Sequence, residues 1–190
     1  SGATNNSIMQ LSMSTDVFDE MPGDDPIIKE QFGLRDGLAS EETKREIHYT
    51  GIERYPLQEE VVRTLDYPSL IGKGHNDDYF AIHQAPWGED VSLSPSFTLH
   101  KIEGDFTQYT FERKYDIIYF DAFAPEKQPE MWDQSLFDSL YHALNEGGIL
   151  TTYCAKGVVR RMLQASGFMV ERLPGPPGGK REILRATKTN

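Results

Sequence analysis

The sequence contains only one cysteine, Cys154, among its 190 residues, and it has no apolar run of about 18 residues and no internal repeat. A lone cysteine excludes an internal disulfide and favours a reducing, cytoplasmic location. Without a long apolar run, no segment is predicted to span a membrane. The first six residues lack the basic start and apolar stretch of a secretion signal, so we interpret them as a remnant of cloning or a loose terminus.

Metal-binding patterns are also missing. The five histidines show none of the spacings typical of metal ligands, so no metal site is predicted. Nothing beside Cys154 suggests an activated thiolate. The two tryptophans, Trp87 and Trp132, are expected to pack against other side chains rather than to serve as platforms for nucleobases. The histidines concerned are His48, His75, His83, His100 and His142.

Charge is distributed unevenly along the chain. The net charge of −11 argues at first against a nucleic-acid partner. From Leu150 onward, however, there are eight basic and two acidic residues, so this segment carries +6 and the remainder carries −17. Such asymmetry permits a local basic patch on an acidic protein, although a merely solvated surface explains it equally well.

Apolar periodicity and turn residues predict alternating strands and helices, which is typical of an α/β sheet covered by helices. The six-residue Pro/Gly segment 174–179 is too short for a parallel crossover, so the last two strands are expected to pair antiparallel. A mostly parallel sheet with one reversed strand near its C-terminal end is the architecture of class I methyltransferases. Helices are expected at 57–65, 132–144 and 158–165, and strands at 47–53, 79–82, 97–102, 115–121, 149–153, 168–173 and 181–187.

Two local expectations accompany this architecture. The residues 86–90 supply turn material between the expected strands 79–82 and 97–102, so an antiparallel excursion is predicted there. The run 115–121 is almost continuously apolar, which is typical of a strand buried on both faces in the middle of a parallel sheet.

Three of the expected strands lead into an acid: Glu53, Asp105 and Asp121. Ligands of open α/β sheets bind outside the carboxyl ends of the strands. A carboxylate there can accept hydrogen bonds from a ribose diol or from an exocyclic amine. Any one of these acids is readily explained as a helix cap or a solvated turn residue. The set of three fits a nucleoside-containing cofactor, without separating S-adenosylmethionine from NAD.

The segment 121–125, Asp-Ala-Phe-Ala-Pro, follows the buried strand directly. It would hold a carboxylate and an aromatic ring together at the mouth of a pocket. Methylation of an amine needs a neutral nitrogen aligned with the methyl group. A carboxylate such as Asp121 can orient the amine and accept its proton, while a ring such as that of Phe123 excludes water.

Long motifs support a more specific hypothesis. The segments 116–132, 151–161 and 173–182 closely resemble the signature of the MnmC/MnmD family, and the resemblance extends over about three quarters of the chain, from Glu46 onward. It implies a methyltransferase that uses S-adenosyl-L-methionine and converts the 5-aminomethyl group of (2-thio)uridine to the 5-methylaminomethyl form. The nucleoside would be the wobble uridine at position 34 of the tRNA anticodon.

The resemblance also implies roles for individual residues. Glu53 matches the acid that binds the cofactor ribose, and Asp105 and Phe106 match the pair at the adenine. Asp121 matches the catalytic acid that faces the target amine. We place Phe123 and Lys156 on the substrate side, and we infer from charge that the matching basic pair, Lys180 and Arg181, lies near phosphate. The remaining residues expected at the cofactor are Gly104, Ala122 and Asp121, which is thus expected to contact both the cofactor and the amine.

The N-terminal part of the chain departs from the family pattern. Family members begin their sheet with a strand and a glycine loop, whereas here only the segment 32–38 offers two glycines and no clear strand precedes it. Residues 1–45 are therefore interpreted as an atypical, partly disordered segment, and residues 46–190 as the methyltransferase-like domain. Some family members are fused to an FAD-dependent oxidase, so fusion or association with such a domain is an open possibility that the resemblance implies.

Two alternatives stay open at this point. One is a non-catalytic binding or scaffold protein that has kept the methyltransferase fold and lost the glycine loop. The other is a methyltransferase acting on a small amine, in which the C-terminal basic cluster is only solvated surface. Cofactor binding separates the first alternative from the tRNA-modifying enzyme, and salt-dependent binding of tRNA separates the second.

Overall fold

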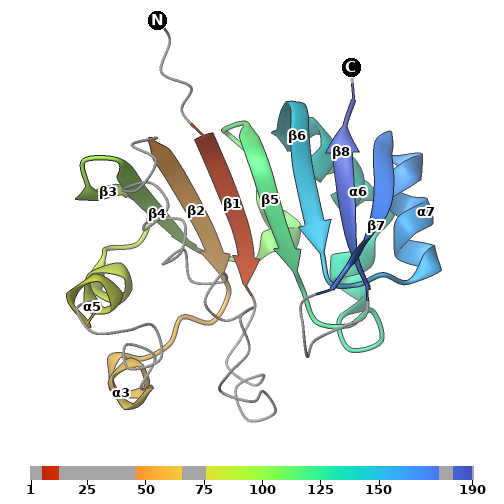
Figure 1. The fold of residues 1–190 in the computed structure, drawn as a ribbon. Helices are drawn as coiled ribbons and strands as arrows, with labels where there is room; N and C mark the ends of the chain where they lie inside the picture. The colour runs from red at the N-terminus through yellow and green to blue at the C-terminus, as the bar shows by residue number, and fades with distance from the viewer. Residues whose placement is uncertain (1–5, 13–45, 66–75, 176–181, 190) are drawn as a thin grey trace, which may run out of the picture.

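The computed structural model describes residues 6–12, 46–65, 76–175 and 182–189. The described strands form one sheet with helices on both faces (Figure 1). The strands are β1 (Asn6–Ser12), β2 (Ile47–Glu53), β3 (Asp90–Ser94), β4 (Phe97–Glu103), β5 (Tyr115–Asp121), β6 (Leu144–Thr152), β7 (Phe168–Pro174) and β8 (Glu182–Lys188). The α-helices are α3 (Glu59–Thr64), α5 (Asn76–Gln84), α6 (Gln134–Ala143) and α7 (Gly157–Ala165), and the 3₁₀ helices are η2 (Phe106–Gln108) and η3 (Pro129–Trp132).

The strand order is β3-β4-β2-β1-β5-β6-β8-β7. The five strands from β4 to β6 run parallel, whereas β8 is antiparallel to both of its neighbours and β3 is antiparallel to β4. The strands β7 and β8 therefore pair as their short connection predicted. The order reverses direction at β1, so the carboxyl ends of β2 and β5 lie on either side of the end of β1.

The strand β1 was missed by the sequence analysis, which found no strand before Glu46. It lies in the middle of the sheet and pairs in parallel with both β2 and β5. Its segment, Asn-Ser-Ile-Met-Gln-Leu-Ser, has only three apolar residues among four polar ones. A central parallel strand is usually an almost continuous apolar run, so this one gave a weak signal. The segment 32–38 lies outside the described residues.

The expected strand at 79–82 was also wrong, because these residues belong to the helix α5. Asp77 and Asp78 lie in its first turn, where negative charge is stabilised by the helix dipole. The antiparallel partner of β4 is instead β3, which follows the turn at Gly88. The aromatic and β-branched residues at 79–82 favour a strand locally, and tertiary packing overrides that preference.

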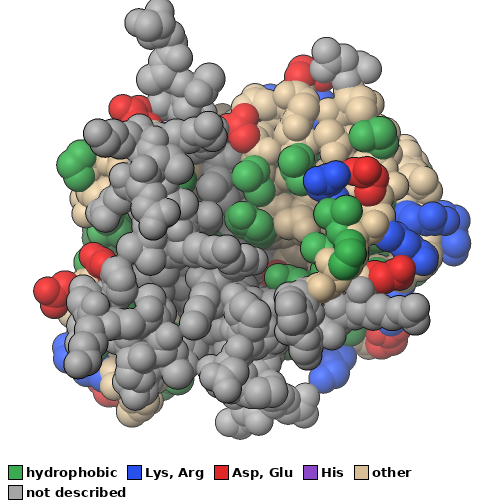
Figure 2. Space-filling model, viewed as in Figure 1, with side chains coloured by type: hydrophobic (Ala, Val, Ile, Leu, Met, Phe, Trp, Pro, Cys, Tyr) green, Lys and Arg blue, Asp and Glu red, His purple; other side chains and the backbone are tan. Residues whose placement is uncertain are grey.

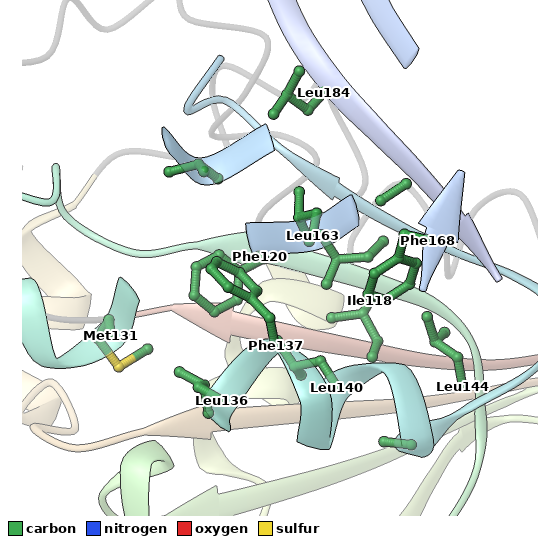
Figure 3. Close-up of a cluster of buried hydrophobic side chains, with 14 of the residues drawn as sticks. Ile118, Phe120, Met131, Leu136, Phe137, Leu140, Leu144, Leu163, Phe168 and Leu184 are labelled. Atoms are coloured by element: carbon green, nitrogen blue, oxygen red, sulfur yellow. The ribbon is translucent and has the colours of Figure 1, made fainter. Parts of the chain in front are cut away.

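The two faces of the sheet contact different helices. Successive strand residues point to opposite faces, so Ile118 and Phe120 pack into the large core with α6 and α7, whereas Ile117 and Tyr119 pack on the other face. Figure 3 shows part of the large core, in which Phe137 of α6 lies beside Phe120. The second face carries a smaller cluster that includes Ile82 of α5.

The helices that cover the large core match the expected ranges, and their ends have clear causes. The Asp133 side chain accepts a hydrogen bond from the Ser135 backbone N–H (2.8 Å) and so caps the start of α6. Apolar residues at 136, 137 and 140 then recur at helical spacing, and all are buried. After α7, Gly167 has a φ of +107°, a conformation that any larger residue would adopt only with strain.

Candidate functional site

The carboxyl ends of the parallel strands meet at one edge of the sheet, at the lower side of Figure 1. In the strand register Ser12 lies beside Asp121, Leu11 beside Ile52, and Glu53 beside Glu103. The ends of β5, β1, β2 and β4 are therefore level. The structure brings the three acids that sequence reasoning singled out to this shared edge, because Glu53 and Asp121 end their strands and Asp105 follows β4 by two residues.

Glu53 and Asp121 also share a face. In β2, Ile47 and Tyr49 pack against the α5 side, and Glu53 has the same alternation; in β5, Asp121 follows Ile117 and Tyr119 in the same way. Both acids are half-buried. Each thus projects from the end of a strand beside β1 toward the same side of the sheet.

Backbone groups hold Glu53 in place. One of its carboxylate oxygens, Oε1, accepts a hydrogen bond from the Tyr55 backbone N–H (2.8 Å). The Glu53 carbonyl oxygen accepts another from the Gly104 backbone N–H (3.0 Å), which connects the ends of β2 and β4. Gly104 therefore lies at the expected edge and helps to fix the position of Glu53.

Asp105 has an ordinary structural role as well as its place at the edge. Its Oδ1 caps η2 by accepting hydrogen bonds from the Thr107 backbone N–H (2.9 Å) and hydroxyl (2.7 Å). Its Oδ2 lies 3.2 Å from Nη1 of Arg54. The Thr107 hydroxyl foremost, and also the Thr107 N–H and the Arg54 guanidinium, hold the pKa of Asp105 below its usual value, so the carboxylate is ionised at neutral pH.

The side chain of Phe106 belongs to the large core. Its ring is only 2% exposed and packs edge-on against Phe111 and Phe120 in the large core. The side chain therefore lies away from the edge, and any contact with a ligand would come from the Phe106 backbone.

The chain leaves the sheet directly after Asp121. Ala122 packs against the large core, and Phe123 is half-buried. The Phe123 carbonyl oxygen accepts a hydrogen bond from Nε1–H of Trp132 (2.7 Å). As expected from the sequence, Trp132 packs in the core, where it is 5% exposed, whereas Trp87 is 38% exposed and lies over the ammonium of Lys101.

Of the three basic residues expected near the substrate, Lys156 is among the described residues. Lys180 and Arg181 lie outside them. Lys156 immediately precedes α7, and its ammonium forms an ion pair with the carboxylate of Glu126. Two further arginines of the basic C-terminal segment are also paired, Arg172 with Glu182 and Arg185 with Glu171. Part of the excess positive charge is therefore balanced by neighbouring acids, and Figure 2 shows blue basic and red acidic side chains next to each other on the right side of the molecule.

Sequence reasoning missed several contacts at this edge. The Arg54–Asp105 and Glu126–Lys156 ion pairs join residues that are 51 and 30 positions apart, and no local pattern predicts them. Trp132 was inside a recognised motif, but its hydrogen bond to the loop after Asp121 was not foreseen. The nearest signal for it was the short spacing between Asp121 and Trp132 within that motif.

Neither a metal centre nor a membrane segment stands out in the part of the chain that the structure describes. Within the described ranges, no three histidine, cysteine, aspartate or glutamate side chains are grouped so that they could hold a metal ion. None of the described helices is long and apolar enough to cross a membrane.

Comparisons with known proteins agree with this architecture. Residues 89–189 match a family described as S-adenosyl-L-methionine-dependent methyltransferase. The chain is 35% identical over 147 residues to the bifunctional tRNA 5-methylaminomethyl-2-thiouridine biosynthesis protein MnmC of Pseudomonas fluorescens. The aligned region covers 73% of this chain and 22% of that protein. It is 30% identical over 186 residues to MnmC of Pseudomonas savastanoi, covering 90% of this chain and 28% of that protein.

A solved structure shows the same fold. The crystal structure of MnmC2 from Aquifex aeolicus matches with a TM-score of 0.65 at 18% identity, over 98% of this chain and 54% of the other. The expected class I methyltransferase architecture is thereby confirmed. The chain spans only about a quarter of the length of the curated relatives it matches. On the evidence of the family match over more than half of its residues, the chain belongs to the family of S-adenosyl-L-methionine-dependent methyltransferases that includes the methyltransferase part of MnmC.

Proposed function

We propose that this chain methylates the 5-aminomethyl group of a (2-thio)uridine at the wobble position of tRNA, with S-adenosyl-L-methionine as the methyl donor. The observation that carries the proposal is the delivery of Glu53, Asp105 and Asp121 to one sheet edge around the end of β1. The names of the curated relatives, which place them in the biosynthesis of 5-methylaminomethyl-2-thiouridine in tRNA, support this choice of substrate.

The carboxylates at this edge suit a ligand that combines a nucleoside with a positively charged centre. Glu53 offers a carboxylate that a backbone N–H already orients, which suits a ribose diol. Asp105 is ionised and can accept a hydrogen bond from the amine of adenine, and Gly104, Phe106 and Ala122 would line the space with backbone and small groups. When bound there, S-adenosyl-L-methionine supplies a methyl group activated by its positively charged sulfur.

Asp121 is the group that we assign to the reaction itself. Its carboxylate can accept a hydrogen bond from the aminomethyl nitrogen and take up the proton that this nitrogen must lose, so that the lone pair is free to attack. The same negative charge stabilises a cationic amine as it arrives. Phe123, two residues further on, would shield the nitrogen from water.

The substrate side of the proposal extends to the C-terminal segment. We place Lys180 and Arg181 near phosphate groups of the anticodon, because nucleic-acid backbones are bound chiefly by basic side chains. The curated relatives are bifunctional proteins by name, so we also propose that this activity works beside a second enzymatic unit, an FAD-dependent oxidase.

Replacement of Asp121 by asparagine tests the proposal, because this change keeps the shape of the side chain and removes its charge. We expect the rate of methyl transfer to tRNA that carries the 5-aminomethyl group to fall by about 100-fold or more, since a general base typically contributes 10²–10⁴-fold. Binding of S-adenosylhomocysteine, followed by calorimetry, should weaken far less than the rate falls, because asparagine can still form a hydrogen bond to the cofactor.

The matched control is Asp116→Asn. Asp116 is the second residue of the same strand and lies at the opposite edge of the sheet, where its Oδ1 accepts a hydrogen bond from the Asn145 side chain. The substitution should leave the rate near that of the wild type. Near-normal turnover of Asp121→Asn would contradict the catalytic role. If wild-type protein bound no S-adenosylhomocysteine at millimolar concentration, the scaffold alternative would replace the enzymatic one.

A further inference from the structure

The loop that follows Asp121 is fixed to the rest of the protein at two separate points. After β5 the chain forms a tight turn, in which the backbone N–H groups of Lys127 and Gln128 donate to the carbonyl oxygen of Ala124 (2.8 and 3.1 Å). The helix η3 and then α6 follow. Since residues 122–128 continue directly from Asp121, the path of this loop sets the position of Phe123 and steadies the end of the strand from which Asp121 projects.

Trp132 provides the first point. Its indole ring packs edge-on against Phe120 (5.1 Å between ring centroids) and against Phe137 (6.2 Å), and both phenylalanines are at most 1% exposed. Figure 3 shows these two rings in the centre of the core. From this fixed position the indole N–H donates to the Phe123 carbonyl oxygen at 2.7 Å. The hydrogen bond thereby ties the loop to the core two residues after Asp121.

The Glu126–Lys156 ion pair provides the second point. Glu126 lies at the turn of the loop, and Lys156 belongs to the connection between β6 and α7, so the pair joins the loop to the neighbouring crossover. The hydrogen bond from Lys156 lowers the pKa of Glu126, which keeps the carboxylate ionised. Both side chains are exposed, and the pair therefore adds little to the stability of the whole fold.

We propose that Trp132 and the Glu126–Lys156 ion pair are positioning residues, which hold the loop 122–128 so that Asp121 and Phe123 face the reacting nitrogen. The proposal rests on the function proposed above for Asp121. It gives Lys156, which the sequence analysis placed on the substrate side, the task of holding the loop. In this proposal Trp132 and the ion pair act through the loop, by way of the Phe123 carbonyl oxygen and of Glu126.

The two tryptophans offer a matched pair of variants. Trp132→Phe keeps a large ring in the core but removes the N–H that binds the Phe123 carbonyl oxygen. Trp87→Phe makes the same chemical change at an exposed position on the outer side of β4. We expect Trp132→Phe to lower kcat by about 10- to 100-fold, because small misplacements of reacting groups have effects of this size. The Kd for S-adenosylhomocysteine should stay within about twofold, and Trp87→Phe should change neither quantity.

Amide hydrogen exchange in the cofactor-free protein gives a readout that does not need activity. We expect faster exchange in Trp132→Phe within residues 122–128, and unchanged exchange in the buried strands β5 and β6. Faster exchange throughout the sheet would mean that Trp132 only stabilises the core, and the proposal would then be wrong. An unchanged loop together with an unchanged kcat would also overturn it.

The ion pair is tested with Glu126→Gln, Lys156→Gln and the exchanged pair Glu126→Lys with Lys156→Glu. We expect each single variant to lower kcat by about two- to fivefold, in line with the energy of exposed ion pairs, and the exchanged pair to recover most of the loss. A raised KM for tRNA in the Lys156 variant alone would show that Lys156 contacts RNA and would contradict the proposal. If the wild type fails to methylate tRNA, the proposed function fails, whereas the exchange experiment still decides whether the loop is held.

Discussion

The two faces of the sheet are covered by different kinds of side chains. The face under α6 and α7 is covered by a continuous cluster of aliphatic and aromatic side chains, many of which are fully buried (Figure 3). On the face under α5 the described cluster is smaller, and beside it lies Lys101, which is only 9% exposed. The Lys101 ammonium donates to the His83 carbonyl oxygen (2.8 Å) and lies over the ring of Trp87 (4.6 Å from its centroid).

This difference has electrostatic consequences. Burial lowers the pKa of Lys101 to about 8, and burial together with the charge of Lys101 lowers the pKa of His83 to about 4. The first face holds the loop after Asp121 through Trp132, so it acts as the rigid support of the site. The second face carries Glu53 and Asp121 at its edge, and it contains groups whose charge changes with pH. We conclude that one face supplies stability and the other combines packing with electrostatics.

The largest effect on the free energy of unfolding is expected when a buried phenylalanine is replaced, and one phenylalanine from each cluster gives a matched comparison. Phe137 of α6 is fully buried in the large core, and Phe97 of β4 is 4% exposed in the smaller cluster. We expect Phe137→Ala to lower the free energy of unfolding by about 3–5 kcal/mol, because the surrounding rings cannot collapse into the space left. Phe97→Ala should cost about 1–2 kcal/mol less, since the cluster that surrounds it is smaller among the described residues. Urea unfolding at neutral pH measures both, and equal losses would contradict the contrast between the faces.

The sequence predicted the rigid face well, for physical reasons. The continuous apolar run at 115–121 and the apolar spacing of Leu136, Phe137 and Leu140 result directly from burial in a dry core, which leaves a strong periodic pattern. The other face leaves a weaker pattern, because β4 places a lysine where alternation predicts an apolar residue, and because aromatic residues in α5 favour a strand. The mixed polar and apolar segment of β1 was missed for a similar reason.

The candidate site was predictable only in part. Parallel strands end at the same edge, so acids that follow strands could be placed together from the sequence. The side-chain partners of these acids could not be. Arg54 reaches Asp105, and Lys156 reaches Glu126, through rotamers that depend on how distant elements pack. The same holds for Phe106, whose ring turns into the core rather than toward the edge.

An effect of intermediate size is expected on the stability of the protein at acid pH, and it comes from His83 on the second face. Because the folded-state pKa of His83 is about 4, below its ordinary value of 6.5, the unfolded chain binds a proton more readily than the folded one between these two pH values. The free energy of unfolding should therefore fall as the pH drops from 6.5 to 4, by about 2–3 kcal/mol from this group. His83→Phe, which retains a ring beside Tyr79, should lose this part of the pH dependence.

Urea unfolding of the wild type and of His83→Phe at pH 7 and pH 4.5 measures this difference directly. The carboxylates that also titrate in this range are present in both proteins, so their contributions cancel in the comparison. Lys101→Met gives a second check, because removal of the nearby positive charge should raise the pKa of His83 toward its ordinary value and so reduce the loss of stability between pH 6.5 and 4. Identical pH profiles for wild type and His83→Phe would show that the second face does not titrate as proposed.

The smallest effects are expected for two surface ion pairs, which lie on opposite faces of the hairpin formed by β7 and β8. Glu171 and Arg185 lie directly opposite each other in the register, and Nε and Nη2 of Arg185 both donate to Glu171 (3.1 and 2.8 Å). Arg172, which points to the other face, makes a single longer contact with Glu182 (3.4 Å). All four side chains are more than 40% exposed, so each pair should contribute less than about 1 kcal/mol.

Double-mutant cycles to alanine should give the larger coupling energy for Glu171–Arg185, and this energy should decrease in 0.5 M salt because exposed charges are screened. A larger coupling for Arg172–Glu182 would mean that the side of the hairpin, rather than hydrogen-bond geometry, determines the strength of these surface pairs.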